Sequence, residues 1–141
     1  MKALILMTIM LATTPLKTYD VSLVYCYDGD TCNLNFHLGF GAVLVDQGVR
    51  LCDIDTPEMR YAEQKPAAIA ARDALVSWMK AAKKLEIQVP QKSNCLAGAG
   101  ELCDKTGKYG RWLVYIIADG VNLNQKLVKE GFAAEYGLKC Q

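Results

Sequence analysis

The stretch RLCDIDTPE, residues 50–58, carries the pattern of a buried strand into a cluster of charged side chains. Val49 and Leu51 flank Arg50, so on a strand both apolar side chains point to the core while the arginine points to the opposite side. Acidic residues and a Thr-Pro pair follow within the same stretch. A strand with this much charge at its end leads either into an ordinary turn or into one wall of a site for an anionic ligand.

Strand patterns lie on both sides of this stretch. The Asp-Gly pair at residues 28–29 separates two strand-like runs, which is a strong signal for a β-hairpin. Apolar and polar side chains then alternate in TCNLNFHL, as they do in a half-buried strand. A turn, a short apolar run and a second turn are expected within residues 39–48. The predicted strands are residues 21–27, 31–38, 49–54, 84–89 and 109–118.

Two helices are expected among these strands. Pro66 suits the first turn of a helix whose apolar residues recur at helical spacing within residues 69–82. Asn122 can cap a second helix, with Gln125 at the capping-box position and Gly131 at its end. Five strands, with one helix after the third and one after the fifth, fit a β-barrel with helices (α+β), a five-stranded Greek-key barrel of the OB type. A generic α+β domain is the alternative.

The composition limits the classes of function. A chain of 141 residues is long enough for one domain with its own hydrophobic core. Lys and Arg total 16 against 15 Asp and Glu, a net charge of +1, which excludes a polybasic nucleic-acid binder. Affinity for phosphate must therefore come from a local cluster of cations or from a metal.

Residues 1–14 have the composition of a signal peptide. One lysine precedes an apolar run from Ala3 to Ala12 that only Thr8 interrupts. The run is too short to span a bilayer and has the proportions of the apolar region of a signal peptide. An uncleaved anchor and a first buried strand are the alternatives. We expect a secreted or periplasmic protein with one domain over residues 20–138.

The six cysteines favour the same compartment. An even number behind a signal-like segment suits an oxidising environment, and the lack of a C-x-x-C motif with only one histidine argues against zinc. Cys95 and Cys103 bracket a glycine-rich loop and are expected to form a local disulfide. Cys26 and Cys32 could face each other across the first hairpin, whereas a pair of Cys32 with Cys52 competes with that choice.

Three segments place charge where predicted strands end: DGDT (28–31), RLCDIDTPE and TGKYGR (106–111). Asp30 and Asp55 are short carboxylates on turns and could converge on one hard cation. The Thr56 carbonyl is a possible third ligand, because the proline that follows favours an extended backbone there. A site with few protein oxygens and spare positions suits Ca²⁺.

The remaining charges fit hydrolysis of a phosphodiester. Glu58, three residues beyond Asp55, can hold or deprotonate a water beside such an ion. Arg50 and Arg111 can bind the phosphate oxygens that gain charge as water attacks, because a guanidinium matches them bidentately and stays protonated.

In their order and spacing, DGDT, RLCDIDTPE and KYGR resemble the staphylococcal nuclease (thermonuclease) family, and the resemblance extends from about Val21 to Tyr136. It implies an OB-fold, calcium-dependent nuclease that hydrolyses DNA and RNA with little sequence preference and leaves 3′-phosphate ends. The resemblance assigns catalytic positions to Arg50, Glu58 and Arg111, calcium positions to Asp30, Asp55 and Thr56, and substrate contacts to Lys108, Tyr109 and Tyr136. The chain is longer than the family pattern between Thr31 and Arg50, so we expect an extended second hairpin.

The alternative function is a catalytically silent OB-fold module that binds single-stranded nucleic acid or a protein. Such a module is expected to carry a basic, aromatic strand face, whereas TCNLNFHL presents asparagines. The complete catalytic set favours the enzyme. We expect a monomer without a stable protein partner, and no membrane association once the signal is removed.

Overall fold

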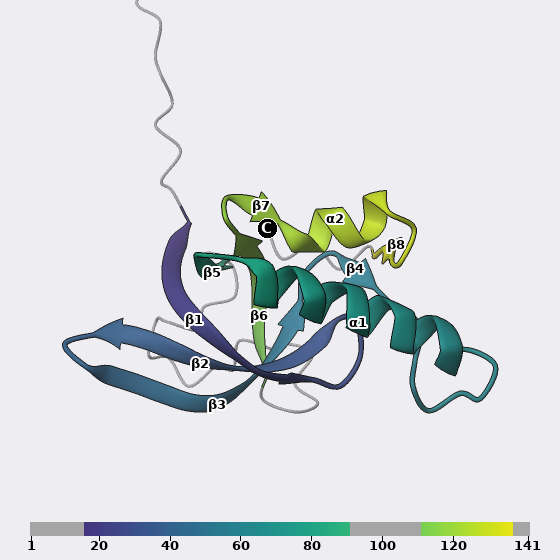
Figure 1. The fold of residues 1–141 in the computed structure, drawn as a ribbon, viewed down its shortest axis with the longest axis horizontal. Helices are drawn as coiled ribbons and strands as arrows, with labels where there is room; N and C mark the ends of the chain where they lie inside the picture. Colours follow the sequence, from purple (N-terminus) through teal and green to yellow (C-terminus); the bar gives the residue numbers. More distant parts are fainter. Residues whose placement is uncertain (1–15, 91–110, 137–141) are drawn as a thin grey trace, which may run out of the picture.

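The computed structural model describes residues 16–90 and 111–136 of the chain. Within these ranges it has eight strands and two helices (Figure 1). In chain order they are β1 (Lys17–Cys26), β2 (Thr31–Gly39), β3 (Ala42–Leu51), β4 (Ile54–Asp55), α1 (Lys65–Ala81), β5 (Leu85–Val89), β6 (Trp112–Ala118), β7 (Val121–Asn122), α2 (Leu123–Lys129) and β8 (Ala134–Glu135).

Five of the strands form a closed mixed barrel. β1 pairs antiparallel with both β2 and β5, β2 with β3, and β5 with β6. A parallel pairing of β3 with β6, in the register Val49↔Trp112, closes the circle. Closure leaves the barrel without a free edge where these strands meet. With its two helices this is the OB-type barrel that the sequence predicts.

The core lies inside the barrel, where alternate side chains of the strands meet. Val49 and Leu51 are 0% and 1% exposed, while the Arg50 side chain between them is 18% exposed, so the predicted alternation on β3 is confirmed. Helix α1 contributes Ala68, Ala71, Leu75 and Met79 to the buried side.

The two helices lie next to each other on one side of the barrel (Figure 1). Pro66 stands in the first turn of α1, as predicted. Asn122 caps α2 by accepting a hydrogen bond from the Gln125 amide at 3.2 Å. The rings of Trp78 and Phe132 meet edge to face with centroids 6.0 Å apart, which joins the end of α1 to the segment after α2.

The third strand differs from the prediction at its start. In place of a turn at residues 46–48, β3 runs without a break from Ala42 and contains a β-bulge, with Asp46 at a φ of +53°. Side chains of β2 hold the bulge: Asn33 donates to the Asp46 carboxylate at 2.8 Å, and Asn35 accepts from the Asp46 amide at 2.9 Å. Asn33 and Asn35 are distant from Asp46 in the sequence. The residues next to Asp46 therefore show only the pattern of a turn.

The end of this strand also differs. β3 ends at Leu51 and not at Ile54, because Asp53 adopts a left-handed φ of +65° that turns the chain before β4. The short β4 then pairs with β8 near the carboxyl end of the described residues.

The β2–β3 hairpin projects well beyond the barrel, as expected from the extra residues between Thr31 and Arg50 (Figure 1). Its tip carries the fully exposed Phe40. In the part of the chain that the structure describes, no helix is long and apolar enough to cross a membrane.

A disulfide joins Cys26 at the end of β1 to Cys32 in β2. This pairing was one of the two open alternatives, and the competing pair of Cys32 with Cys52 is therefore wrong. Cys52 takes part in another disulfide. The predicted Cys95–Cys103 bridge and the signal segment lie outside the described residues.

Candidate active site

A cavity of about 340 Å³ opens where the β1–β2 turn, β3 and the start of β6 meet. Most of its walls are charged. It is lined by Tyr27, Asp28, Asp30, Thr31, Arg50, Glu58, Arg60 and Arg111. Four residues that the sequence singled out, Asp30, Arg50, Glu58 and Arg111, therefore share one cavity.

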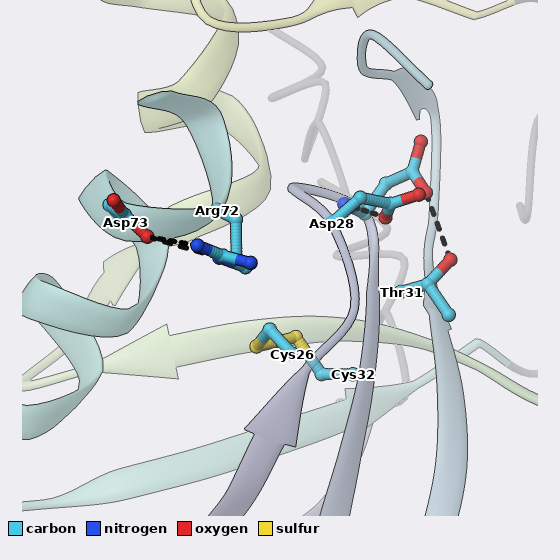
Figure 2. The surroundings of a disulfide bond; sticks show 7 residues. Cys26, Asp28, Thr31, Cys32, Arg72 and Asp73 are labelled. Carbon is cyan, nitrogen blue, oxygen red and sulfur yellow. Dashed lines mark hydrogen bonds and ion pairs between the residues drawn. A yellow bond between two sulfur atoms is a disulfide. The ribbon is translucent and has the colours of Figure 1, made fainter. Parts of the chain in front are cut away.

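The β1–β2 turn is held tightly against the rest of the protein. A Cβ added at Gly29 would lie 2.8 Å from both the Ala71 Cβ on α1 and the Thr56 Cγ2, so only glycine fits there. The disulfide between Cys26 and Cys32 joins the two strands at the base of this turn (Figure 2). The turn is therefore a rigid support for the acids that it carries.

Asp30 connects the segments that form the site. Its Oδ1 accepts a hydrogen bond from the Thr31 hydroxyl at 3.0 Å. Its Oδ2 accepts the Thr56 amide at 3.0 Å and lies 3.2 Å from Nη2 of Arg50. One buried carboxylate thus joins the β1–β2 turn, β3 and the start of the loop after β4.

The guanidinium of Arg50 is fixed by several oxygens. Nη1 donates to the Leu51 carbonyl at 2.9 Å, and Nη2 donates to the Ile54 carbonyl at 3.1 Å. Nη2 also lies 3.4 Å from the Asp55 carboxylate. Arg50 is therefore held in one orientation at the wall of the cavity before any ligand binds.

Arg111 reaches the same cavity through the parallel pairing of β3 with β6. Because Trp112 pairs with Val49, Arg111 lies beside the last part of β3. A Cβ added at Gly48 would lie 3.5 Å from the Cγ of Arg111. Its Nη1 donates to the Thr31 hydroxyl at 3.2 Å. The topology thus brings two arginines that are far apart in sequence to one site.

Glu58 stands on the loop between β4 and α1. Its amide donates to the Gln64 side chain at 3.0 Å, which fixes the backbone of the loop. Its own carboxylate is 40% exposed and lies 3.6 Å from Nε of Arg60. A carboxylate that reaches solvent at the wall of a cavity can accept a proton from water.

The model of a protein family described as "Staphylococcal nuclease homologue" matches residues 48–140, more than half of the chain. The chain belongs to this family. Membership in this family indicates a nuclease-type function on nucleic acid, and the closed barrel agrees with it. The match includes Arg50, Glu58 and Arg111.

The acids of this nuclease homologue repel one another. Burial, and after it the neighbouring charge of Asp30, raise the pKa of Asp28 from 3.8 to about 7, with a smaller contribution from Glu58. The Asp28 carboxylate accepts the Asp30 amide at 3.1 Å. The sequence interpretation missed Asp28 because Asp-Gly alone reads as a turn, although the second acid two residues later was a usable signal.

The donor set fits a hard divalent cation. Among residues 16–90 and 111–136, no group of three or more His, Cys, Asp or Glu side chains has the geometry to hold a metal. Asp30 and Asp55 nevertheless converge, since both carboxylates lie within 3.4 Å of Nη2 of Arg50. The buried hydroxyl of Thr56 has no hydrogen-bond partner in the described structure. Oxygen donors of this kind suit Ca²⁺.

Other predicted residues lie elsewhere. Tyr136 lines a different cavity, of about 760 Å³, together with Asp53 and Tyr115. Its amide donates to the Asp53 carbonyl at 2.8 Å, because the β4–β8 pairing fixes the chain there. Lys108 and Tyr109 lie outside the described residues. Tyr27, Thr31 and Arg60 line the active-site cavity but were not singled out in the sequence.

Proposed function

We propose that this protein is a calcium-dependent nuclease that hydrolyses phosphodiester bonds of DNA, RNA or both with little sequence specificity and leaves 3′-phosphate ends. The observation that carries the proposal is the shared cavity of Arg50, Arg111 and Glu58 in a chain of a nuclease family. Two guanidinium groups and one solvent-accessible carboxylate are the groups that this reaction needs.

The arginines bind the phosphate. Nε and one Nη1 proton of Arg50 have no partner among the described residues, while carbonyl and carboxylate oxygens fix the rest of the guanidinium. A donor held in place before the reaction loses little energy to reorganisation when charge develops on the phosphate oxygens. Arg111 supplies a second guanidinium to the same phosphate.

Glu58 acts on the water. It accepts a proton as the water oxygen attacks phosphorus, and the bond between phosphorus and the 5′-oxygen breaks. The 5′-oxygen leaves and takes up a proton, so that the products are a 3′-phosphate and a 5′-hydroxyl. The partial exposure of the Glu58 carboxylate allows it to return its proton to solvent.

Asp30, Asp55 and the Thr56 carbonyl would hold Ca²⁺, which when bound supplies positive charge to the phosphate and to the attacking water. Asp28 supports this set because its carboxylate accepts the Asp30 amide. Lys108, Tyr109 and Tyr136 are proposed as further substrate contacts. We also propose that residues 1–14 direct export to a secreted or periplasmic location and that the protein acts as a monomer.

Cleavage of end-labelled single-stranded DNA and RNA, with millimolar calcium or with chelator, tests the proposal. We expect cleavage with calcium, none with chelator, and products that lose their terminal phosphate to a phosphatase active on 3′-ends. Glu58→Gln and Arg111→Ala should each lose about 100-fold or more in turnover, with thermal unfolding unchanged. Binding of the oligonucleotides without any cleavage would instead support the catalytically silent OB-fold module.

A further inference from the structure

Two side chains that line the active-site cavity, and a third that contacts one of them, have no part in the proposed chemistry. Tyr27 and Arg60 line the cavity, and Tyr61 lies beneath Arg60. All three are accessible: Tyr27 is 53% exposed, Tyr61 is 41% exposed, and the side chain of Arg60 is 67% exposed. Exposed aromatic rings beside a phosphate site are the groups on which the bases of a single strand stack.

Arg60 is held in position at the wall of the cavity. Its guanidinium carbon lies 4.7 Å from the centroid of the Tyr61 ring, and its Nε lies 3.6 Å from the Glu58 carboxylate. Stacking on an aromatic ring orients a guanidinium and leaves its N–H groups at the edge available for an anion. Because the Glu58 ion pair is exposed, it is weak enough for a substrate phosphate to replace it.

Tyr27 stands on a fixed backbone. It follows the last residue of β1, and its amide donates to the Thr31 carbonyl at 2.9 Å, which closes the tight turn above the disulfide. The Tyr27 ring is therefore attached to a fixed backbone and is exposed to solvent. This combination favours stacking, since little conformational freedom is lost when a base binds.

We propose that Tyr27 and Arg60 form a subsite for a nucleotide flanking the scissile bond of a single-stranded nucleic acid. Tyr27 stacks on the base, and Arg60, oriented by Tyr61, binds the phosphate next to the scissile one. When Arg60 turns to that phosphate it leaves Glu58, so that occupation of the subsite frees the carboxylate for water. The inference rests on the proposed nuclease function.

The chain offers a matched control for each side chain. Tyr25 is 53% exposed, as Tyr27 is, and lies only two residues away, but it does not line the cavity. Lys126 is a cation over an aromatic ring, 4.5 Å from the centroid of Trp78, on α2 and outside the cavity lining. Tyr27→Ala is therefore compared with Tyr25→Ala, and Arg60→Gln with Lys126→Gln.

The experiment measures kcat and KM on thymidine oligonucleotides of two and five nucleotides in the full-length protein with calcium. Stacking of one base contributes about 1–3 kcal/mol, so Tyr27→Ala should raise KM for the pentanucleotide roughly 5- to 100-fold, and Tyr27→Phe should restore it. Arg60→Gln should raise KM for the pentanucleotide. For the dinucleotide, which has no second phosphate, kcat/KM should not fall and should rise by at most about fivefold, because the weak ion pair with Glu58 is lost. Both control variants should match the wild type.

Dissociation constants for a fluorescent pentathymidine separate failure of the subsite from failure of the proposed function. If the wild type cleaves but Tyr27→Ala equals Tyr25→Ala in both KM and dissociation constant, the subsite is wrong. If the wild type cleaves nothing, the nuclease proposal fails. Weaker binding by Tyr27→Ala and Arg60→Gln than by their controls would then still support a subsite for single-stranded nucleic acid, and equal binding would overturn it.

Discussion

Nη2 of Arg50 lies 3.2 Å from Oδ2 of Asp30, and this ion pair joins β3 to the turn between β1 and β2. The Arg50 side chain is 18% exposed and that of Asp30 is 6% exposed. Removal of the Arg50 charge would leave the buried Asp30 carboxylate without its ion-pair partner, whereas Arg50 also lies 3.4 Å from the Asp55 carboxylate. Arg50 therefore connects the parts of the cavity in addition to the phosphate-binding role proposed for it.

Arg50→Lys should lower kcat/KM by about 100-fold or more. A lysine keeps a positive charge near Asp30, but it cannot replace the bonds of the guanidinium to the Leu51 and Ile54 carbonyls or bind a phosphate bidentately. Steady-state cleavage of single-stranded DNA measures the loss. Arg72→Lys is the control, because Arg72 pairs with Asp73 on α1 and does not line the cavity. Activity of Arg50→Lys within threefold of the control would contradict the assignment.

Asp28 should make the protein less stable as pH rises from about 4 to about 7. Its folded-state pKa, raised from 3.8 to about 7 by burial and by Asp30, means that the folded protein keeps a proton which the unfolded chain has already released. Stability is therefore greater below the unfolded pKa and falls until pH exceeds the folded pKa. A shift of this size corresponds to roughly 2–4 kcal/mol at most, at about 1.4 kcal/mol per pKa unit.

Urea unfolding at intervals from pH 4 to pH 8, in chelator, measures this slope. Asp28→Asn should flatten it and should be more stable than the wild type above pH 7, because an amide has no charge to bury. Asp73→Asn, which changes an exposed acid on α1, should retain the wild-type slope. An unchanged slope in Asp28→Asn would show that other groups cause the pH dependence.

The barrel and half of the active site could be predicted from the sequence because their signals are local. Alternation placed Arg50 opposite the core, and the charged strand ends indicated which segments meet. The β-bulge at Asp46 could not be predicted, since amides from β2 hold it. The same reason applies to Asp28, which is buried because the turn beside it packs on α1 at Ala71.

Tyr136 and Arg60 show what a motif does not contain. For Tyr136, which is proposed as a substrate contact, the β4–β8 pairing fixes the backbone to Asp53 and puts the residue in the lining of the second cavity. Arg60 stands two residues beyond Glu58 in an unremarkable sequence. Only the three-dimensional arrangement places its guanidinium over the Tyr61 ring and beside the Glu58 carboxylate, which is proposed to accept the proton from water.

Replacement of both Cys26 and Cys32 by serine should destabilise the protein by about 2 kcal/mol in the chain-entropy account of a short loop. It should also lower cleavage, because the disulfide holds the base of the turn that carries Asp28 and Asp30. Urea unfolding and cleavage assays of the double variant measure both effects. The variant removes only the Cys26–Cys32 disulfide, whereas added reductant would also act on the disulfide of Cys52. Wild-type stability in the variant would show that packing around Gly29 holds the turn without the disulfide.

Asn124 should be the most costly polar residue of α2 to replace. Its side chain is buried and makes three hydrogen bonds to backbone, accepting from the Ile116 amide at 3.1 Å and donating to the Cys52 and Val114 carbonyls at 3.0 and 3.1 Å. Alanine would remove the Asn124 partner of the Ile116 amide and of the Cys52 carbonyl, whereas the Val114 carbonyl would keep its hydrogen bond from the Cys52 amide at 2.9 Å, so we expect a loss of about 3 kcal/mol in unfolding free energy.

The control for this prediction lies two residues earlier. Asn122 is exposed enough for solvent to replace its single capping bond to the Gln125 amide, and Asn122→Ala should cost only about 1 kcal/mol. Because Asn124 also fixes the chain just after β3, its loss should lower cleavage more than the loss of the cap does. Equal effects of the two substitutions on stability and activity would mean that the amide of Asn124 does not hold the β3–β4 turn against β6.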